Sequence, residues 1–475
     1  MLLWIKLSRI NLNLADRHLI KSSVEFAFSS YVFQIINFGM TLILVRLLVP
    51  EYFGLFALLM AFKELLYALF GFSTPMYFIL SDGKQADFNM SLNLSILSAI
   101  GLIFAGVFIS LWLQSTEKSE IAVPFLLLCF CQGISNIAAI FLAPVERETQ
   151  YLKLSLIRNI AATLSLAICV IIAFIWPSFW ALIFRELMLS LILLFAGIGF
   201  CKLRISFQFN RNLMLDAIRT GYQITLSRAA EILFYRAPEI FISRFFGLAQ
   251  TGHFFQSRNF LMLVLKIPNT ILDQTLFSTF AKMNRTDGTN KTYVFLLVLI
   301  LSRMMMLVSL SITFLGPIIF TFFYGENWHL ASKLIPDLAW FVFFAALFNF
   351  AQAYCYSNKA QMLVFVSYAV GIFTFCLFGI YAVKQSDLSL VAWGLTLSMG
   401  TACIPIYFWG KVFDHPIKYI RVFWLPALTS FSIFIPVNSD ILNPLILVAS
   451  LILVALCVSI FEISRESQYF SNRSL

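Results

Sequence analysis

Apolar stretches of about twenty residues recur along almost the whole chain, from Val24 to Phe461, with short polar gaps between them. A bilayer core about 30 Å thick is crossed by about 20 apolar residues in a helix. Within hydrocarbon, a helix satisfies every backbone N–H and C=O inside its own segment. The chain is therefore predicted to be an all-α, polytopic membrane protein.

The apolar stretches number about fourteen, so we expect about fourteen transmembrane helices. Apolar residues make up 60% of the 475 positions and charged residues only 12%, which also favours a membrane protein. Little sequence remains for a water-soluble domain. The expected spans, with ends uncertain by a few residues, are 24–45, 55–80, 91–113, 122–143, 154–175, 180–200, 220–243, 252–280, 292–315, 332–356, 362–383, 390–410, 422–437 and 444–461.

Basic residues between the spans predict the orientation. If the N-terminus is inside, the inner segments hold twenty Lys and Arg, and the outer loops hold five: Arg46, Lys118, Arg244, Lys333 and Lys384. The positive-inside rule therefore places both termini in the cytoplasm. The same count explains the net charge of +10 by topology, so nucleic acid is not an expected partner.

The chain is expected to divide after six spans. We predict a cytoplasmic N-terminal segment (1–23), an N-lobe (24–200), a cytoplasmic linker (201–219), a C-lobe (220–410), two extra helices (411–461) and a cytoplasmic tail (462–475). A faint internal echo supports two related halves, because Arg46 precedes Gly54 by the same spacing as Arg244 precedes Gly252. The outer segment from Gly316 to Ala331 contains Pro317 and Gly325, and either a short re-entrant piece or an ordinary loop fits it.

Charged side chains inside the predicted spans are the candidate functional residues. A charge that faces lipid near the midplane costs roughly 3 kcal/mol, so most must face the protein interior or a hydrated cavity. Eight cations lie in spans: Lys63, Arg158, Arg185, Arg228, Arg236, Arg258, Lys266 and Arg303. The acidic residues in or beside spans are Glu25, Glu64, Glu186, Glu231, Glu239, Asp273 and Asp337.

These charges have two interpretations. Neighbouring or i+3 pairs such as Arg236 and Glu239 can simply join helices to one another. Arg258, Lys266 and Arg303 have no obvious local partner, and an excess of buried positive charge would suit a phosphate or diphosphate. The predicted substrate-binding residues are Arg228, Arg236, Arg258, Lys266, Arg303 and Lys63. Glu64, Glu231, Glu239 and Asp273 are the ion-coupling candidates, for H⁺ or Na⁺.

Other chemistry has little support in the sequence. The four histidines form no metal-ligand spacing, and the eight cysteines form no CxxC pair, so we expect no metal and no bound cofactor. Neither a GxxxxGK[ST] loop nor a GxSxG motif occurs, and we expect no catalytic residue and no enzymatic activity.

Four segments, in order, carry a family resemblance that covers about residues 20 to 410. The chain resembles the bacterial polysaccharide or O-antigen flippases of the Wzx type, whose superfamily also contains the MATE drug exporters and lipid II flippases. The segments are LVRLLVPEYFGLFAL (44–58), APVERETQYLKLSLIRN (143–159), ISRFFGLAQTGHFFQSRNFLMLVLKIPNTI (242–271) and FFYGENWHLASKLIPDLAW (322–340). The loop after Gly247, FGLAQTG, is a looser version of the usual pattern.

The resemblance implies two six-helix lobes around a central cavity, with two added C-terminal helices. It also implies export of undecaprenyl-diphosphate-linked oligosaccharide across the bacterial inner membrane by alternating access. Arg228, Arg236, Arg258, Lys266 and Arg303 are the positions that fit the cationic cavity of that family. Expected partners are the lipid-linked oligosaccharide, membrane lipid and other membrane proteins of polysaccharide assembly.

Three alternatives stay open at this point. A MATE-type drug exporter would favour an acidic and aromatic cavity, whereas the charges within these spans lean basic. A membrane polysaccharide polymerase would need a sizeable outer loop. A purely structural membrane protein would have little use for so many buried charges.

Overall fold

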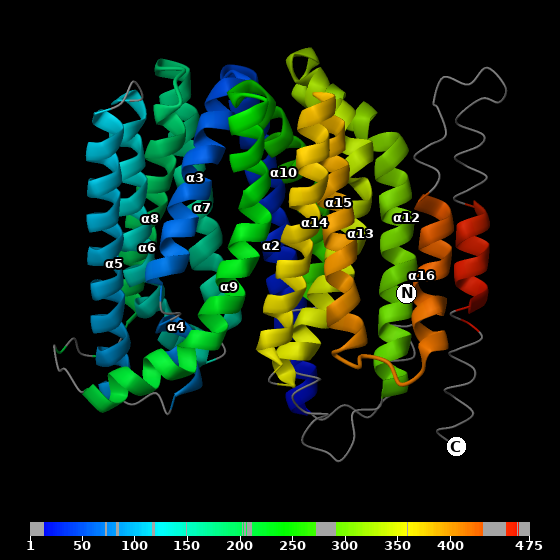
Figure 1. The fold of residues 1–475 in the computed structure, drawn as a ribbon. Coiled ribbons are helices and arrows are strands. Elements are labelled where there is room, and N and C mark those ends of the chain that lie inside the picture. The colour runs from blue at the N-terminus through cyan, green and yellow to red at the C-terminus, as the bar shows by residue number, and fades with distance from the viewer. Residues whose placement is uncertain are drawn as a thin grey trace. The chain divides into compact units, whose positions relative to one another are not determined.

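The structure is a computed structural model, and it describes residues 14–71, 74–81, 85–115, 119–148, 150–201, 203, 206, 211–271, 291–358, 360–430, 453–462 and 464. Within these ranges every regular element is a helix (Figure 1). Nine of the described helical segments are long and apolar enough to cross a membrane, and they coincide with nine of the fourteen predicted spans. The all-helical membrane fold is therefore confirmed.

Two compact units divide the chain. The first contains residues 1–47 and 69–222, and the second contains residues 48–68 and 223–475. The long part of the second unit begins at residue 223, close to the end of the predicted linker at 219. Helix α3 (Pro50–Phe70), which the sequence placed in the N-lobe, instead has nearly all of its residues in the second unit.

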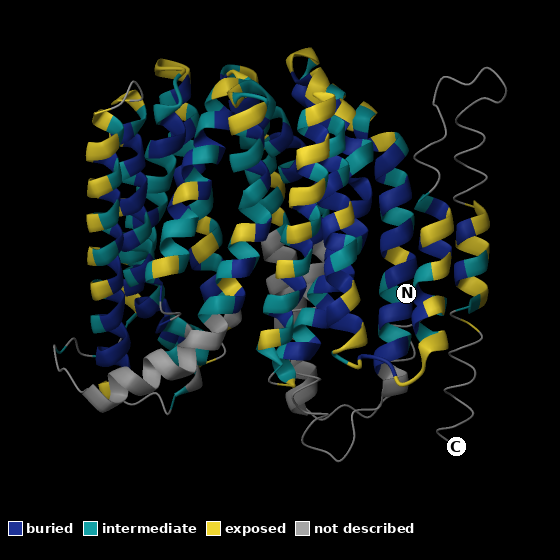
Figure 2. Cartoon of the chain, viewed as in Figure 1, coloured by how far each residue is buried: buried dark blue, intermediate teal, exposed yellow. Residues whose placement is uncertain are grey.

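The first unit is built around α6 (Ala122–Arg147), which packs against α5 (Gln85–Gln114), α8 (Trp180–Phe200) and the short α4 (Thr74–Leu80). The remaining helices of this unit are α2 (Leu14–Leu47) and α7 (Tyr151–Ile175), which pack against each other. The side chain of Thr163 in α7 donates a hydrogen bond of 3.1 Å to that of Asn37 in α2. Buried and exposed residues alternate along α5, and its exposed residues include Phe104 and Phe108 (Figure 2). Such apolar exposure is expected of a helix that faces lipid.

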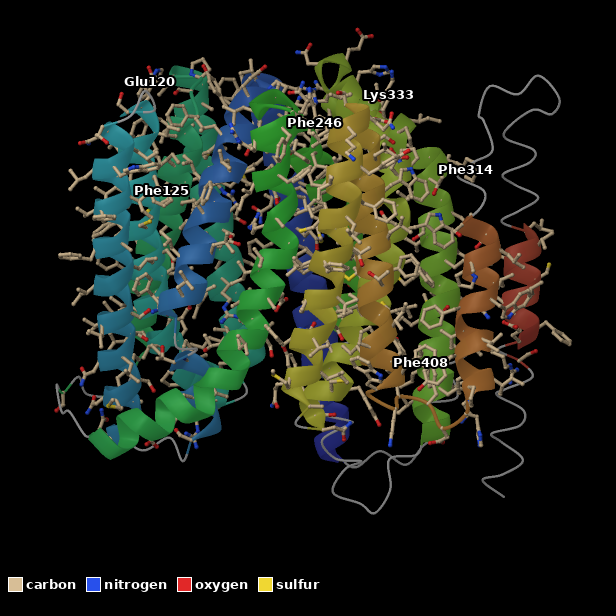
Figure 3. The ribbon with its side chains drawn as sticks, viewed as in Figure 1. Glu120, Phe125, Phe246, Phe314, Lys333 and Phe408 are labelled. Atoms are coloured by element: carbon tan, nitrogen blue, oxygen red, sulfur yellow. The ribbon has the colours of Figure 1, made fainter. Side chains whose placement is uncertain are left out.

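The second unit has α13 (His329–Ser357) at its core, against α10 (Leu248–Ile271), α12 (Lys291–Tyr324) and α15 (Leu388–Phe408). The other described helices are α3, α9 (Arg211–Phe245), α14 (Gln361–Gln385), α16 (Pro416–Ser430) and the segment 453–462. In this unit Phe246 and Lys333 lie near one end, and Phe408 lies near the opposite end (Figure 3). This arrangement agrees with the alternation of spans predicted there.

Three boundaries differ from those predicted. The expected span 55–80 is two helices, because α3 ends at Phe70 and α4 begins at Thr74. The predicted linker 201–219 is helical from Arg211 onwards, as the start of α9. The segment 316–331 is mostly helix, because α12 continues through Pro317 to Tyr324 and α13 begins at His329, with the 3-10 turn Glu326–Trp328 between them. Gly325 ends α12 with a φ of 87°, a left-handed conformation that favours glycine.

Candidate substrate and ion-coupling site

Two carboxylates and two guanidinium groups form a chain of ion pairs inside the second unit. Arg236 of α9 donates two hydrogen bonds to Glu64 of α3, both of 2.6 Å, from Nε and Nη2. Arg236 also lies 3.6 Å from Glu239, one turn further along α9. Glu239 forms a second ion pair with Arg258 of α10, so the chain joins three helices.

Exposure falls along this chain of ion pairs. The side chains of Glu64 and Arg236 are 24% and 17% exposed, whereas those of Arg258 and Glu239 are 6% and 0% exposed. Arg258 also donates a hydrogen bond to the backbone carbonyl of Tyr235, which provides a further partner for its buried charge. Lys63 is buried beside Glu64, and its charge also acts on that carboxylate.

Arg258 has no local partner, as expected, but Glu239 of the neighbouring helix neutralises it, so it is not the uncompensated cation that the sequence suggested. The predicted i+3 pairing of Arg236 with Glu239 along α9 is confirmed. The four groups of this chain of ion pairs balance one another, and Lys63 adds a further positive charge beside Glu64. A desolvated charge needs a counter-charge and hydrogen bonds. Each buried group here finds its partner on another helix or one turn away, so the ion pairs hold α3, α9 and α10 together.

Arg303 has a different and separate role. Its guanidinium, on α12, contacts the carboxylate of Glu462 at 2.7 Å and is 1% exposed. It also donates hydrogen bonds to the backbone carbonyls of Arg421 (2.6 Å) and Val422 (3.2 Å) of α16. Arg303 thus has no local partner, but the distant Glu462 neutralises it, and this residue joins α16 and the segment 453–462 to α12.

Arg228 stands apart from the buried pairs. It is exposed on α9, and no described carboxylate lies within ion-pair distance of it. Its charge acts on the Glu231 carboxylate, one turn away on α9, and on the hydroxyl groups of Tyr67 and Tyr356. Arg228 and Lys266 are the predicted substrate-binding cations whose described side chains are exposed, and Arg228 is our first candidate for a ligand contact.

The charge of Glu231 acts on tyrosine side chains of the second unit. The carboxylate lies within electrostatic range of Tyr356 on α13 and of Tyr368 on α14. Gln352 donates a hydrogen bond of 3.2 Å to the Tyr356 hydroxyl. Tyr235 and Tyr368 also pack ring against ring, at 6.4 Å between centroids. Glu231 is thus a half-buried carboxylate whose charge acts on the hydroxyl groups of Tyr356 and Tyr368.

Several of these partners were missed at the sequence level. Tyr356, Tyr368 and Gln352 have no charge, and only the packing of α13 and α14 brings them near α9. Tyr67 could have been chosen from the sequence, because it lies four residues after the candidate Lys63 and therefore on the same helical face. Glu462 could also have been chosen, because it is an acidic residue directly after the last apolar stretch.

The remaining candidates are placed less centrally. Lys266 is exposed near the end of α10, and Asp273 lies outside the described residues. Arg185 and Glu186, neighbours on α8, form the expected pair at 3.9 Å. No group of His, Cys, Asp and Glu side chains within the described ranges is arranged to hold a metal ion.

Gly54 and Gly252, the two glycines of the repeated Arg–Gly spacing, lie against each other in the structure. A Cβ on Gly54 of α3 would lie 1.8 Å from the carbonyl oxygen of Leu248, and one on Gly252 of α10 would lie 1.9 Å from that of Pro50. Only glycine permits so close an approach of two backbones. The α3 and α10 helices therefore cross at these residues, and the ion pairs join them further along.

Membrane-length helices that bury paired charges define this chain as a multi-pass helical membrane protein. Its sequence matches the family described as "Polysaccharide biosynthesis protein" over residues 43–333, which is more than half of the chain. The protein belongs to that family, and the resemblance to polysaccharide exporters is confirmed.

A curated relative is similar to part of the chain. It is the "Succinoglycan biosynthesis transport protein ExoT" of Rhizobium meliloti (strain 1021), 22% identical over 246 residues. That alignment covers 51% of this chain and 49% of the relative, so the chain matches about half the length of this curated protein.

Solved structures of transporters share the fold. The "Lipid II flippase MurJ, inward closed conformation" superposes with a TM-score of 0.65 at 13% identity, covering 95% of this chain and 99% of that one. An inward-facing "multidrug resistance MATE family transporter of the MOP superfamily" gives a TM-score of 0.59 at 16% identity, over 80% and 94% of the two chains. Identities this low establish a common fold only.

Proposed function

We propose that this protein is a flippase for lipid-linked oligosaccharide in a bacterial inner membrane, with both termini in the cytoplasm. It would move undecaprenyl-diphosphate-linked oligosaccharide from the inner to the outer leaflet by alternating access. Membership of the polysaccharide biosynthesis family supports the substrate class, and the fold shared with a lipid II flippase supports the type of transport.

The observation that carries the proposal is the position of Arg228. The predicted span 220–243 places Arg228 within the membrane, where an arginine that faces lipid costs up to about 3 kcal/mol. Its side chain is exposed, and no described carboxylate lies within ion-pair distance of it. A hydrated path or an anion is the favourable surrounding for such a side chain. A guanidinium binds phosphate oxygens through paired hydrogen bonds, so a diphosphate suits Arg228.

Substitution of Arg228 tests this role in a strain whose own copy of the gene is deleted. Arg228→Ala should leave oligosaccharide diphosphate lipid accumulated in the inner leaflet, at a normal level of membrane-inserted protein. Arg228→Lys should restore part of the export, because it keeps the charge but loses the paired hydrogen bonds.

Arg244 provides the matched control, because it is also exposed and lies on the same helix, in its last turn. Arg244→Ala should export as the wild type does. Full export by Arg228→Ala would remove this residue from the site. Failure of the wild-type chain to clear the accumulated lipid would contradict the proposed function as a whole.

We further propose Glu231 as the ion-coupling residue. Glu64 and Glu239 are committed to arginines, whereas Glu231 has no described ion-pair partner and lies among hydroxyl groups. A carboxylate in this setting can exchange H⁺ or Na⁺ without breaking a salt bridge. Asp273 stays a candidate from sequence, since it lies outside the described residues.

The same carboxylate supports a second candidate function, ion-coupled export of organic cations. An acidic group among the rings of Tyr235, Tyr356 and Tyr368 would suit a cationic aromatic drug. Uptake of a fluorescent organic cation by proteoliposomes distinguishes the two functions. We expect no such transport by the wild-type protein under conditions in which it flips an oligosaccharide diphosphate lipid.

A further inference from the structure

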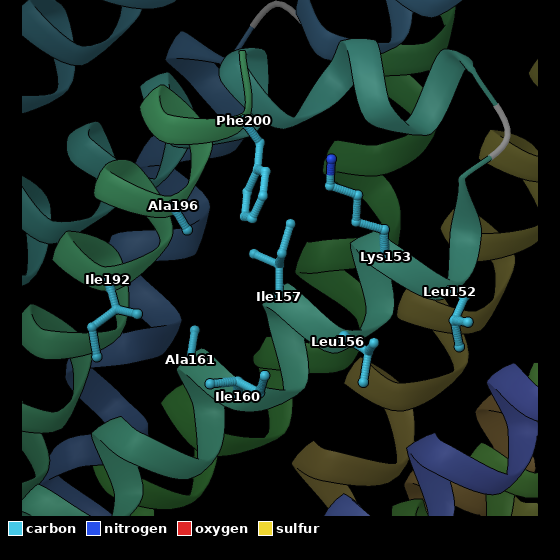
Figure 4. A pocket seen from close by; sticks show the side chains of 9 residues that line it. All are labelled: Leu152, Lys153, Leu156, Ile157, Ile160, Ala161, Ile192, Ala196 and Phe200. Atoms are coloured by element: carbon cyan, nitrogen blue, oxygen red, sulfur yellow. The ribbon is translucent and has the colours of Figure 1, made fainter.

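A groove opens between α7 and α8 in the first unit (Figure 4). Its volume is about 410 Å³, and its walls come from residues 152–161 of α7 and 192–200 of α8. Ala161 and Ala196 are the small residues of the lining, and they leave the space that larger side chains would fill. Lys153 is the one charged side chain among the residues that line it.

Lys153 and Phe200 face each other across the groove. The Lys153 ammonium lies 4.3 Å from the centroid of the Phe200 ring, so the two helices contribute one side chain each to this contact. No carboxylate in the described part of the chain pairs with Lys153. Arg158, on the same helix, differs in this respect, because Glu146 binds it at 3.1 Å. The groove thus combines an apolar trough with an uncompensated cation.

The position of the groove fits one leaflet of a bilayer. From Lys153 to Ala161 the helix rises about 12 Å, and half of the hydrocarbon core is about 15 Å. The predicted topology places Lys153 at the inner surface, where anionic headgroups gather. Basic pockets between transmembrane helices on this side are suited to anionic lipid.

We infer that this groove is a binding site for an anionic phospholipid of the inner leaflet. One acyl chain lies in the apolar trough, and the phosphate accepts hydrogen bonds from the Lys153 ammonium. A groove of this length matches the chain of a phospholipid better than a polyprenyl chain, which is much longer. The site is independent of the proposed transport function, and its test measures binding alone.

Retention of lipid by the purified full-length protein tests the assignment. The protein is mixed with phosphatidylglycerol or phosphatidylcholine of identical acyl chains, and the bound lipid is counted by native mass spectrometry. We expect a preference of about fivefold for phosphatidylglycerol, which corresponds to about 1 kcal/mol for one cation near an anionic surface. Equal retention of the two lipids by the wild type would overturn the proposal.

Five variants locate the site. Lys153→Gln should abolish the preference for phosphatidylglycerol and Lys153→Arg should keep it, whereas Arg158→Gln should have no effect. Ala196→Leu should displace the lipid by filling the groove. Gly199→Leu introduces the same leucine side chain on the same helix, at a position where a Cβ meets nothing within 4 Å, and it should retain the lipid.

Other outcomes contradict the assignment directly. Equal loss of preference in Lys153→Gln and Arg158→Gln would show a general surface effect. Unchanged lipid retention by Ala196→Leu would show that the chain lies elsewhere. Displacement of phosphatidylglycerol by an equal concentration of polyprenyl phosphate would assign the groove to the transported lipid instead. Size-exclusion profiles that match the wild type establish that each variant is folded.

Discussion

Arg236 on α9 binds Glu64 on α3 through two hydrogen bonds of 2.6 Å, across 172 positions of sequence. This ion pair joins α3 to α9. Residues 48–68, which make up most of α3, belong to the second unit. A bidentate guanidinium–carboxylate pair combines strength with a defined geometry. Four predictions follow from this pair and from the other contacts of the second unit.

Loss of either partner of the Arg236–Glu64 pair should destabilise the protein. Arg236→Leu leaves Glu64 partly buried without its counter-charge, and such a change costs about 3 kcal/mol in buried pairs. The double variant Glu64→Leu with Arg236→Leu should be more stable than the sum of the two single losses predicts. Thermal unfolding of the purified variants measures this coupling, and strictly additive losses would show that the pair contributes no interaction of its own.

Alanine at Gly54 or Gly252 should disrupt the crossing of α3 and α10. Each new Cβ would lie within 2 Å of a carbonyl oxygen, and a backbone atom cannot move aside as a flexible side chain can. We expect a loss at the upper end of the range of about 1–3 kcal/mol for overpacking, or failure to accumulate folded protein. Gly39→Ala on α2 is the control, because nothing lies within 4 Å of its Cβ. Wild-type melting of Gly54→Ala would contradict the close contact.

Arg303→Ala should lower stability rather than remove a substrate contact. It would leave Glu462 without its guanidinium partner and remove hydrogen bonds to the carbonyls of Arg421 and Val422. Glu462→Ala should have a similar effect, and combining the two should add little, because both break one contact. The readout is the melting temperature together with the protein level in the membrane. Lost export at unchanged stability would instead return Arg303 to the transport site.

Glu231→Gln should uncouple transport from its driving ion. The amide keeps the size and hydrogen-bonding capacity of the side chain but cannot carry the charge that exchanges H⁺ or Na⁺. In proteoliposomes, an imposed proton or sodium gradient should accelerate flipping by the wild type and have no effect on the variant. Asp387→Asn is a suitable control, since that carboxylate caps the start of α15. An undiminished response to the gradient in Glu231→Gln would exclude this residue.

Hydropathy alone was enough to predict the fold class, because the cost of burying an unpaired backbone in lipid acts on each segment separately. For this reason the spans from 91 to 200 and from 332 to 410 agree closely with α5 to α8 and α13 to α15. Pro317 misled the prediction because proline and glycine mark loops in most contexts, yet α12 accommodates it within its length.

Partners across helices could not be read from spacing. Arg258 and Arg303 looked uncompensated because Glu239 and Glu462 lie 19 and 159 positions away, on other helices. The equal spacing of Arg46 to Gly54 and Arg244 to Gly252 was visible in the chain, but the contact between the two glycines was not. Which charges are neutralised depends on how helices pack, and packing joins residues that have no local relationship. The apolar composition of each segment therefore determines that it inserts into a membrane. Which charges are structural and which face a ligand is decided only when the helices pack together.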